Sequence, residues 1–167
     1  MCRRRQRPNP KARAIVTPDE RRLRSESFDR TLLALREARE AYDVLALSTR
    51  NLRRNYHRPC IAYEVREAEL RPVPTNDAAL DRTPIVLDDD DLAALRTQIV
   101  IPRGTDRLIG IVADGALRAV LALELGELEL DEDDVRYVRS LAAQASLALT
   151  SALAFDHLRR YAAEGAA

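Results

Sequence analysis

The sequence predicts an α+β fold: a central antiparallel sheet of about five or six strands, with long N- and C-terminal helices packed on one face. Three observations lead to this prediction. Apolar residues near both ends of the chain recur alternately three and four positions apart, as in amphipathic helices. The segment between them holds short apolar runs of strand length. Two of these runs meet at Asp114-Gly115, a strong signal for a two-residue hairpin and therefore for antiparallel pairing.

Residues 1–16 contain six basic residues, two prolines and no acidic residue. This composition cannot bury enough apolar surface to fold, so we expect a disordered arm. Its basic residues suit a phosphate-binding tail. The alternative, which we favour, is that the arm is incidental to the function.

A helix is expected to begin after Thr17, because Thr17 can cap it, Pro18 suits its first position and Glu20 completes a capping box. The apolar seam continues to Tyr56, so residues 17–58 are predicted to form one long amphipathic helix. Two interpretations of the seam stay open. It is the contact surface of a parallel dimer, which we favour, or the helix packs along its own sheet with a break.

Five segments in the middle of the chain have the residue pattern of strands: 60–65, 70–73, 98–101, 107–113 and 116–125.

The fourth of these runs is apolar at nearly every position, whereas a strand with one buried face would alternate. We therefore expect both of its faces to be covered. Residues 75–87 are predicted to be a loop, and Asp90 or Asp91 to cap a short helix through Arg96.

The last helix is predicted to start at Asp131, where the acidic run through Asp134 suits the positive end of a helix dipole. Its apolar stripe continues to about Tyr161, and residues 162–167 are expected to be a tail. Together with the first helix it supplies the candidate dimer-seam residues Leu35, Tyr42, Leu45, Leu52, Val138, Ala145 and Ala152.

Composition excludes several classes of function. The 27 basic and 27 acidic residues balance, so no overall field attracts nucleic acid, and we expect no nucleic-acid partner. The chain has neither a signal peptide nor an apolar run long enough to span a membrane, which predicts a cytoplasmic protein. No Gly-rich phosphate loop, GxSxG motif or HExxH motif is present. We therefore expect no catalytic constellation and no metal site, and the sequence names no cofactor.

A specific order of features marks the C-terminal half. A hairpin ending in Ala119–Leu123 is followed by a short connection, an acidic helix start at Leu130–Val135 and a helix of the form LAxQAxxAL at Leu141–Leu149. This order resembles GAF domains, the small-molecule sensor modules of bacterial signalling proteins. The resemblance covers residues 98–158 and extends weakly back to Cys60.

The resemblance implies a GAF/PAS-like domain at 59–161, with helices on one face of the sheet and a ligand pocket on the other. It also implies dimerisation through the terminal helices. Two departures are that Leu130 stands where an aromatic residue is usual, and that the 75–97 segment, which normally supplies much of a ligand lid, is short. The short segment favours a small ligand or none. Candidate pocket residues are Tyr63, Ile109, Gly110 and Ile111.

The function expected from this resemblance is a non-enzymatic sensory or regulatory module in signal transduction. It would act as a homodimer, with or without a small ligand, on a kinase or transcription regulator in trans, or as a fragment of a longer sensor. One alternative is an interaction module of longin or roadblock type. Another is a small redox enzyme using Cys60, although we interpret Cys60 as a small apolar residue on a strand.

Overall fold

The computed structural model describes residues 17–98 and 100–166. The predicted arm at 1–16, which contains Cys2, lies outside these residues. In chain order the elements are α1 (Pro18–Glu37), α2 (Ala41–Tyr56), β1 (Cys60–Arg66), β2 (Glu69–Val73), the 3-10 helix η1 (Asp77–Ala79), β3 (Ile85–Val86), α3 (Asp89–Arg96), β4 (Ile101–Arg103), β5 (Asp106–Ala113), β6 (Ala116–Glu124) and α4 (Glu132–Gly165).

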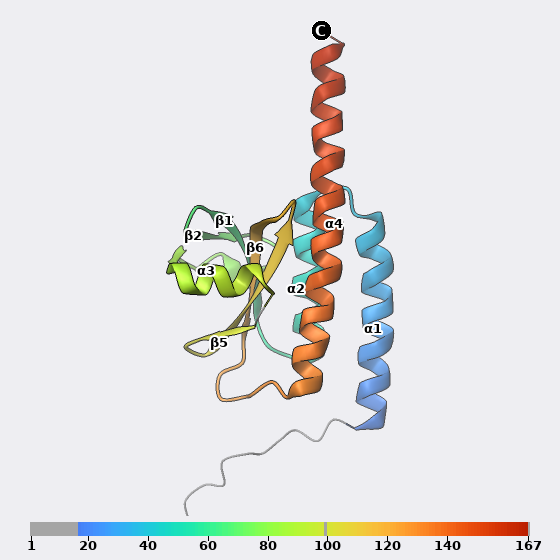
Figure 1. Ribbon diagram of the computed structural model, residues 1–167. Helices are drawn as coiled ribbons and strands as arrows, with labels where there is room; N and C mark the ends of the chain where they lie inside the picture. The colour runs from blue at the N-terminus through green and yellow to red at the C-terminus, as the bar shows by residue number, and fades with distance from the viewer. Residues whose placement is uncertain (1–16, 99, 167) are drawn as a thin grey trace, which may run out of the picture.

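The strands form one antiparallel sheet in the order β3-β2-β1-β6-β5-β4. Figure 1 shows α1, α2 and α4 on one side of this sheet and α3 on the other. The predicted α+β architecture is thereby confirmed. The β5–β6 hairpin turns at Asp114 and Gly115, whose φ angles of 53° and 71° are both positive, as a tight primed turn requires.

The predicted continuous helix over 17–58 is wrong, because the chain doubles back at residues 38–40. Ala38 leaves the helical region with φ −61° and ψ 131°, although no glycine or proline marks the break. The turn places Leu35 of α1 and Leu45 of α2 in the same buried core. Tertiary packing of the two apolar faces therefore overrides a local sequence that favours helix.

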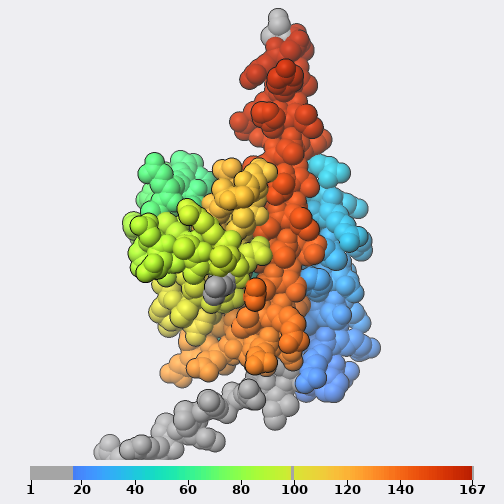
Figure 2. Space-filling model, viewed as in Figure 1, coloured from blue at the N-terminus to red at the C-terminus, as the bar shows by residue number. Residues whose placement is uncertain are grey.

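The helical layer has two tiers. Helices α2 and α4 pack against the sheet, while α1 packs on α2 and α4 from the outside (Figure 1). Helix α1 has the predicted capping box between Thr17 and Glu20, and α4 has one between Asp131 and Asp134. Helix α4 continues to Gly165, into the segment expected to be a tail, and projects beyond the rest of the described residues (Figures 1 and 2).

Three further predictions need correction in the segment between β2 and β5. The cap of α3 is neither Asp90 nor Asp91 but Asp88, whose side chain accepts a hydrogen bond from the main-chain N–H of Asp91. Residues 75–87 include the short edge strand β3, paired with β2, which the sequence prediction missed. The strand predicted at 98–101 is instead β4 at Ile101–Arg103. The main-chain N–H of Gln98 donates to the carbonyl oxygen of Leu95. This bond belongs to the C-terminal turn of α3, so Gln98 cannot belong to the strand, which begins later in the chain.

Candidate functional site: two faces of the sheet and the outer stripe of α4

Strand β5 is covered on both faces, as its apolar sequence predicts. Ile109 and Ile111 are buried in the core shared with the terminal helices. Leu108 is buried in a second core on the opposite face, together with Leu92 and Leu95 of α3. Each face of the strand thus packs against side chains of this same chain.

The four candidate pocket residues do not share one face. Tyr63 belongs to the core beneath α3, whereas Ile109 and Ile111 point toward the terminal helices. Gly110 lies on the α3 side, where a Cβ atom would come within 2.2 Å of the main-chain carbonyl oxygen of Leu95. Alternation along β5 explains this division, because neighbouring residues of a strand face opposite ways.

The face that carries Tyr63 and Gly110 is filled. The buried residues of its core come from the sheet, from α3 and from the 75–87 segment: Ile61, Tyr63, Leu70, Ala79, Leu87, Leu92, Leu95, Ile101, Leu108, Leu117, Val120 and Ala122. The two surface hollows described below are lined by none of them.

The larger hollow, about 650 Å³, lies at the start of α4, where Leu130, Arg136 and Arg139 line it with Gln98. The smaller, about 480 Å³, is lined by residues of α2 and its C-terminal cap: Arg50, Arg53, Arg54 and His57. Within residues 17–98 and 100–166, no group of three or more His, Cys, Asp or Glu side chains is arranged to hold a metal ion.

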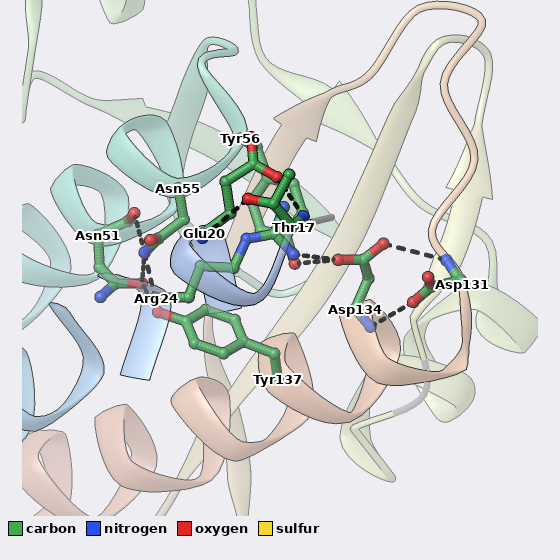
Figure 3. A network of polar contacts seen from close by, with 9 residues as sticks. All are labelled: Thr17, Glu20, Arg24, Asn51, Asn55, Tyr56, Asp131, Asp134 and Tyr137. Atoms are coloured by element: carbon green, nitrogen blue, oxygen red, sulfur yellow. Dashed lines mark hydrogen bonds and ion pairs between the residues drawn. The ribbon is translucent and has the colours of Figure 1, made fainter. Parts of the chain in front are cut away.

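A polar network joins the three terminal helices at the end where α1 and α4 begin (Figure 3). Nη1 of Arg24 on α1 lies 2.8 Å from Oδ1 of Asp134 on α4, and the Tyr56 hydroxyl of α2 donates to the same oxygen at 3.1 Å. Only 24% and 13% of the Arg24 and Asp134 side chains are exposed, and the Arg24 guanidinium lies 4.8 Å above the Tyr56 ring. One carboxylate therefore ties α4 to both other helices.

A second part of the network is formed by Asn51 and Asn55, which precede Tyr56 on α2. The Tyr137 hydroxyl donates to Oδ1 of Asn51 and accepts from Nδ2 of Asn55, each at 2.8 Å. Asn51 also donates to the Thr31 hydroxyl at 3.0 Å. The Tyr137 ring packs edge-on against Phe28 at 5.5 Å between centroids. The sequence prediction missed these residues, although asparagines four apart on an apolar helix are a usable signal of a polar contact.

Burial shifts the pKa values of the phenols in this network. Desolvation, and next the nearby Asp134 carboxylate, raise the pKa of Tyr56 far above its ordinary value. Desolvation also raises the pKa of Tyr137, against a smaller lowering by its hydrogen bond to Asn51. Both phenols are therefore held neutral as hydrogen-bond donors.

The structure buries six of the seven candidate dimer-seam residues inside the chain: Leu35, Leu45, Leu52, Val138, Ala145 and Ala152. Tyr42 is half exposed, and its hydroxyl donates to the carbonyl oxygen of Pro74. The seam residues are thus covered by α1, α2, α4 and the sheet of the same chain, which matches the second interpretation of the seam and not the favoured dimer.

A different face of α4 is exposed and apolar, and we call it the outer stripe: Leu147, Ser151, Ala154, Leu158 and Tyr161. Its members are alternately three and four apart, and the exposed fractions of Leu147, Leu158 and Tyr161 are 64%, 65% and 72%. The opposite face of α4 is buried up to Ala152.

Beyond that point the buried face of α4 becomes charged, with Asp156, Arg159 and Arg160, whereas the outer stripe stays apolar. Helix α4 also has the length and apolar composition of a membrane span, which no other helix among the described residues has. Within its most apolar window, 44% of the residues are buried against the rest of the chain.

Cys60 is fully buried and carries a free thiol. Desolvation raises its pKa well above the ordinary value, and the nearby charge of Arg53 lowers it only in part. A buried, protonated thiol is a poor nucleophile. This environment argues against a redox reaction at Cys60.

Comparison with solved structures identifies the fold. The GAF domain of an Acinetobacter phosphoenolpyruvate-protein phosphotransferase is 11% identical with a TM-score of 0.61, covering 79% of this chain and 95% of that one. The GAF domain of the Escherichia coli potassium sensor histidine kinase KdpD is 12% identical with a TM-score of 0.58, covering 80% and 98%. No protein-family model and no curated protein matches the chain.

Free methionine-R-sulfoxide reductase from Neisseria meningitidis has a similar fold, at 17% identity and a TM-score of 0.62, covering 81% of this chain and 93% of that one. That protein is an enzyme, whereas the structural neighbours are mainly GAF domains of signalling proteins. The chain therefore has the GAF-domain fold, as the sequence resemblance implied.

Proposed function

We propose that this chain, which has the fold of sensory GAF domains, is a non-enzymatic regulatory module that forms a parallel homodimer through the outer stripe of α4. The observation that carries the proposal is the change of character along α4. Where α4 extends past the sheet, the inner face of the helix becomes charged, while Leu158 and Tyr161 keep the outer face of the helix apolar. If water surrounded the projecting helix on all sides, nothing would favour apolar residues on one face and charged residues on the other.

A second copy of the same chain is the occupant that the spacing favours. A stripe with residues alternately three and four apart has the spacing of a two-stranded coiled-coil seam, and here no part of the described chain covers Leu147, Leu158 or Tyr161. The small residues Ser151 and Ala154 between Leu147 and Leu158 permit close approach of the paired helices. In a parallel dimer, the projecting C-terminal ends of both α4 helices would point in the same direction. There they could contact a partner such as a kinase or a transcription regulator in the cytoplasm.

The filled face of the sheet supports regulation without a bound ligand beneath α3. The carbonyl oxygen of Leu95 occupies the space next to Gly110, and Tyr63 is buried among side chains of its own chain. A ligand would have to displace α3 and expose an apolar core. Native mass spectrometry of the freshly purified chain is expected to find no apolar small molecule bound, and a co-purified apolar small molecule would contradict this part of the proposal.

Sedimentation equilibrium tests the dimer. We expect the full chain to sediment as a dimer and the Leu158→Glu variant as a monomer, because the substitution places charges in the apolar seam. Ala163→Glu is the matched control, since it adds the same charge on the opposite face of the projecting helix. A monomeric wild-type chain, or equal dissociation by both substitutions, would contradict the proposal.

A further inference from the structure

A cluster of basic side chains lies at the C-terminal end of α2, away from the outer stripe of α4. Arg50, Arg54 and His57 are four and three residues apart, so they share one face of the helix, and Arg53 lies beside them. All four line one hollow of about 480 Å³. A surface hollow lined only by arginine and histidine is a site of concentrated positive charge.

These cations have no carboxylate partner in the part of the chain that the structure describes. Asp134 and Glu124 are engaged elsewhere, since Asp134 pairs with Arg24 and Glu124 pairs with Arg82. None of the ion pairs formed among residues 17–98 and 100–166 includes Arg50, Arg53 or Arg54.

Arg53 adds one unsatisfied polar atom to this cluster, on the inner side of its side chain. Its Nε atom is buried and has no hydrogen-bond partner among the described residues. Buried polar groups in folded proteins are almost always satisfied, by protein, water or a ligand. The free carbonyl groups at the end of α2 do not neutralise the cluster, because a helix end carries about half an elementary charge against three guanidinium groups.

We propose that this hollow binds a phosphoryl group of a small phosphorylated molecule. Guanidinium groups present paired N–H donors that match the oxygens of a phosphate, and several of them compensate its double negative charge. The cluster spans two turns of one helix, about 10 Å, and opens into one hollow. Nucleic-acid binding, by contrast, requires phosphate contacts distributed along an extended surface.

Isothermal titration calorimetry of the full chain with pyrophosphate and with inorganic phosphate, at constant ionic strength, tests this site. We expect saturable binding of one pyrophosphate per chain. The double variant Arg50→Gln/Arg54→Gln is expected to weaken it by about tenfold or more, since two of the three guanidinium groups are lost. The matched control is Arg96→Gln/Arg118→Gln, which removes the same charge from exposed positions on α3 and β6 and should leave the affinity unchanged.

The full chain retains residues 1–16, so the comparison of the two double variants separates α2 from the basic arm. A circular dichroism spectrum and a melting temperature equal to those of the wild-type chain confirm that a variant is folded. Absence of pyrophosphate binding, equal weakening by both double variants, or binding of single-stranded RNA or anionic vesicles without binding of pyrophosphate would each overturn the proposal.

Discussion

The main-chain carbonyl oxygen of Leu95 occupies the position that a side chain at Gly110 would need. A Cβ atom there would lie 2.2 Å from that oxygen and 3.0 Å from Cδ1 of Leu117. Helix α3 is therefore seated directly on β5, and this contact closes the face of the sheet on which the family resemblance placed a ligand pocket.

Gly110→Ala is expected to destabilise the chain by about 3 kcal/mol, because the backbone of α3 has to move. The ordinary gain from replacing a strand glycine by alanine, about 0.5–1 kcal/mol, is too small to compensate. Urea unfolding measures the change. Gly165→Ala is the control, since a Cβ atom there meets nothing within 4 Å, and an unchanged midpoint for Gly110→Ala would show that α3 is not tightly seated.

A double-mutant cycle on Arg24 and Asp134 is expected to give a coupling energy of about 1.5–3 kcal/mol, as for charged hydrogen bonds that are largely screened from water. The variants Arg24→Leu and Asp134→Asn, alone and combined, define the cycle. The exposed pair Arg136 and Asp133 on α4 is the control, with an expected coupling within about 0.5 kcal/mol. Equal coupling in the two pairs would mean that the network does not hold the three helices together.

The stability of the chain is expected to fall above pH 10. The pKa of Tyr56 is raised by burial, so the unfolded chain loses this proton while the folded chain retains it. The free energy of unfolding then decreases by up to about 1.4 kcal/mol per pH unit for each such phenol. Stability below pH 10 is unaffected by this group, because it is protonated in both states.

Tyr56→Phe tests this pH dependence. We expect it to lower stability by about 1 kcal/mol at pH 8, through the lost hydrogen bond to Asp134, and to reduce the slope above pH 10. Tyr42→Phe is the matched control, since it removes a half-exposed phenol that also donates one hydrogen bond, to the carbonyl oxygen of Pro74. An unchanged slope in Tyr56→Phe would contradict the assignment.

The Cys60 thiol is expected to be unreactive in the folded chain. In a Cys2→Ser background, Ellman's reagent should label Cys60 only at the rate of unfolding, because the thiol is buried and its pKa is raised. Denaturant should make it fully reactive. Fast labelling of the native chain would reopen the redox-enzyme interpretation.

Most of the architecture could be predicted from local signals. Asp114-Gly115 fixed the central hairpin, and Thr17 and Asp131 marked helix starts that the structure confirms. The turn between Leu35 and Leu45 could not be predicted, because residues 38–40 are good helix formers and only packing of two distant apolar faces bends the chain.

The site was predicted less well, for a related reason. The sequence shows that β5 is apolar on both faces, but not whether side chains or a ligand cover the face of Gly110. The carbonyl group of Leu95 is a main-chain group, so no residue pattern reveals it. Similarly, an apolar seam on a helix does not say whether its own chain or a second copy covers it. Here the chain itself covers Leu35, Leu45 and Leu52.

Disulfide cross-linking of Ala154→Cys, in a Cys2→Ser background, tests the proposed parallel dimer most directly. In a parallel coiled coil the same residue of each chain meets across the seam, so oxidation should convert most of the chain into a covalent dimer. Ala163→Cys, on the opposite face of the same projecting helix, should form no covalent dimer under the same conditions. Failure of Ala154→Cys to cross-link, or equal cross-linking at both positions, would contradict the account.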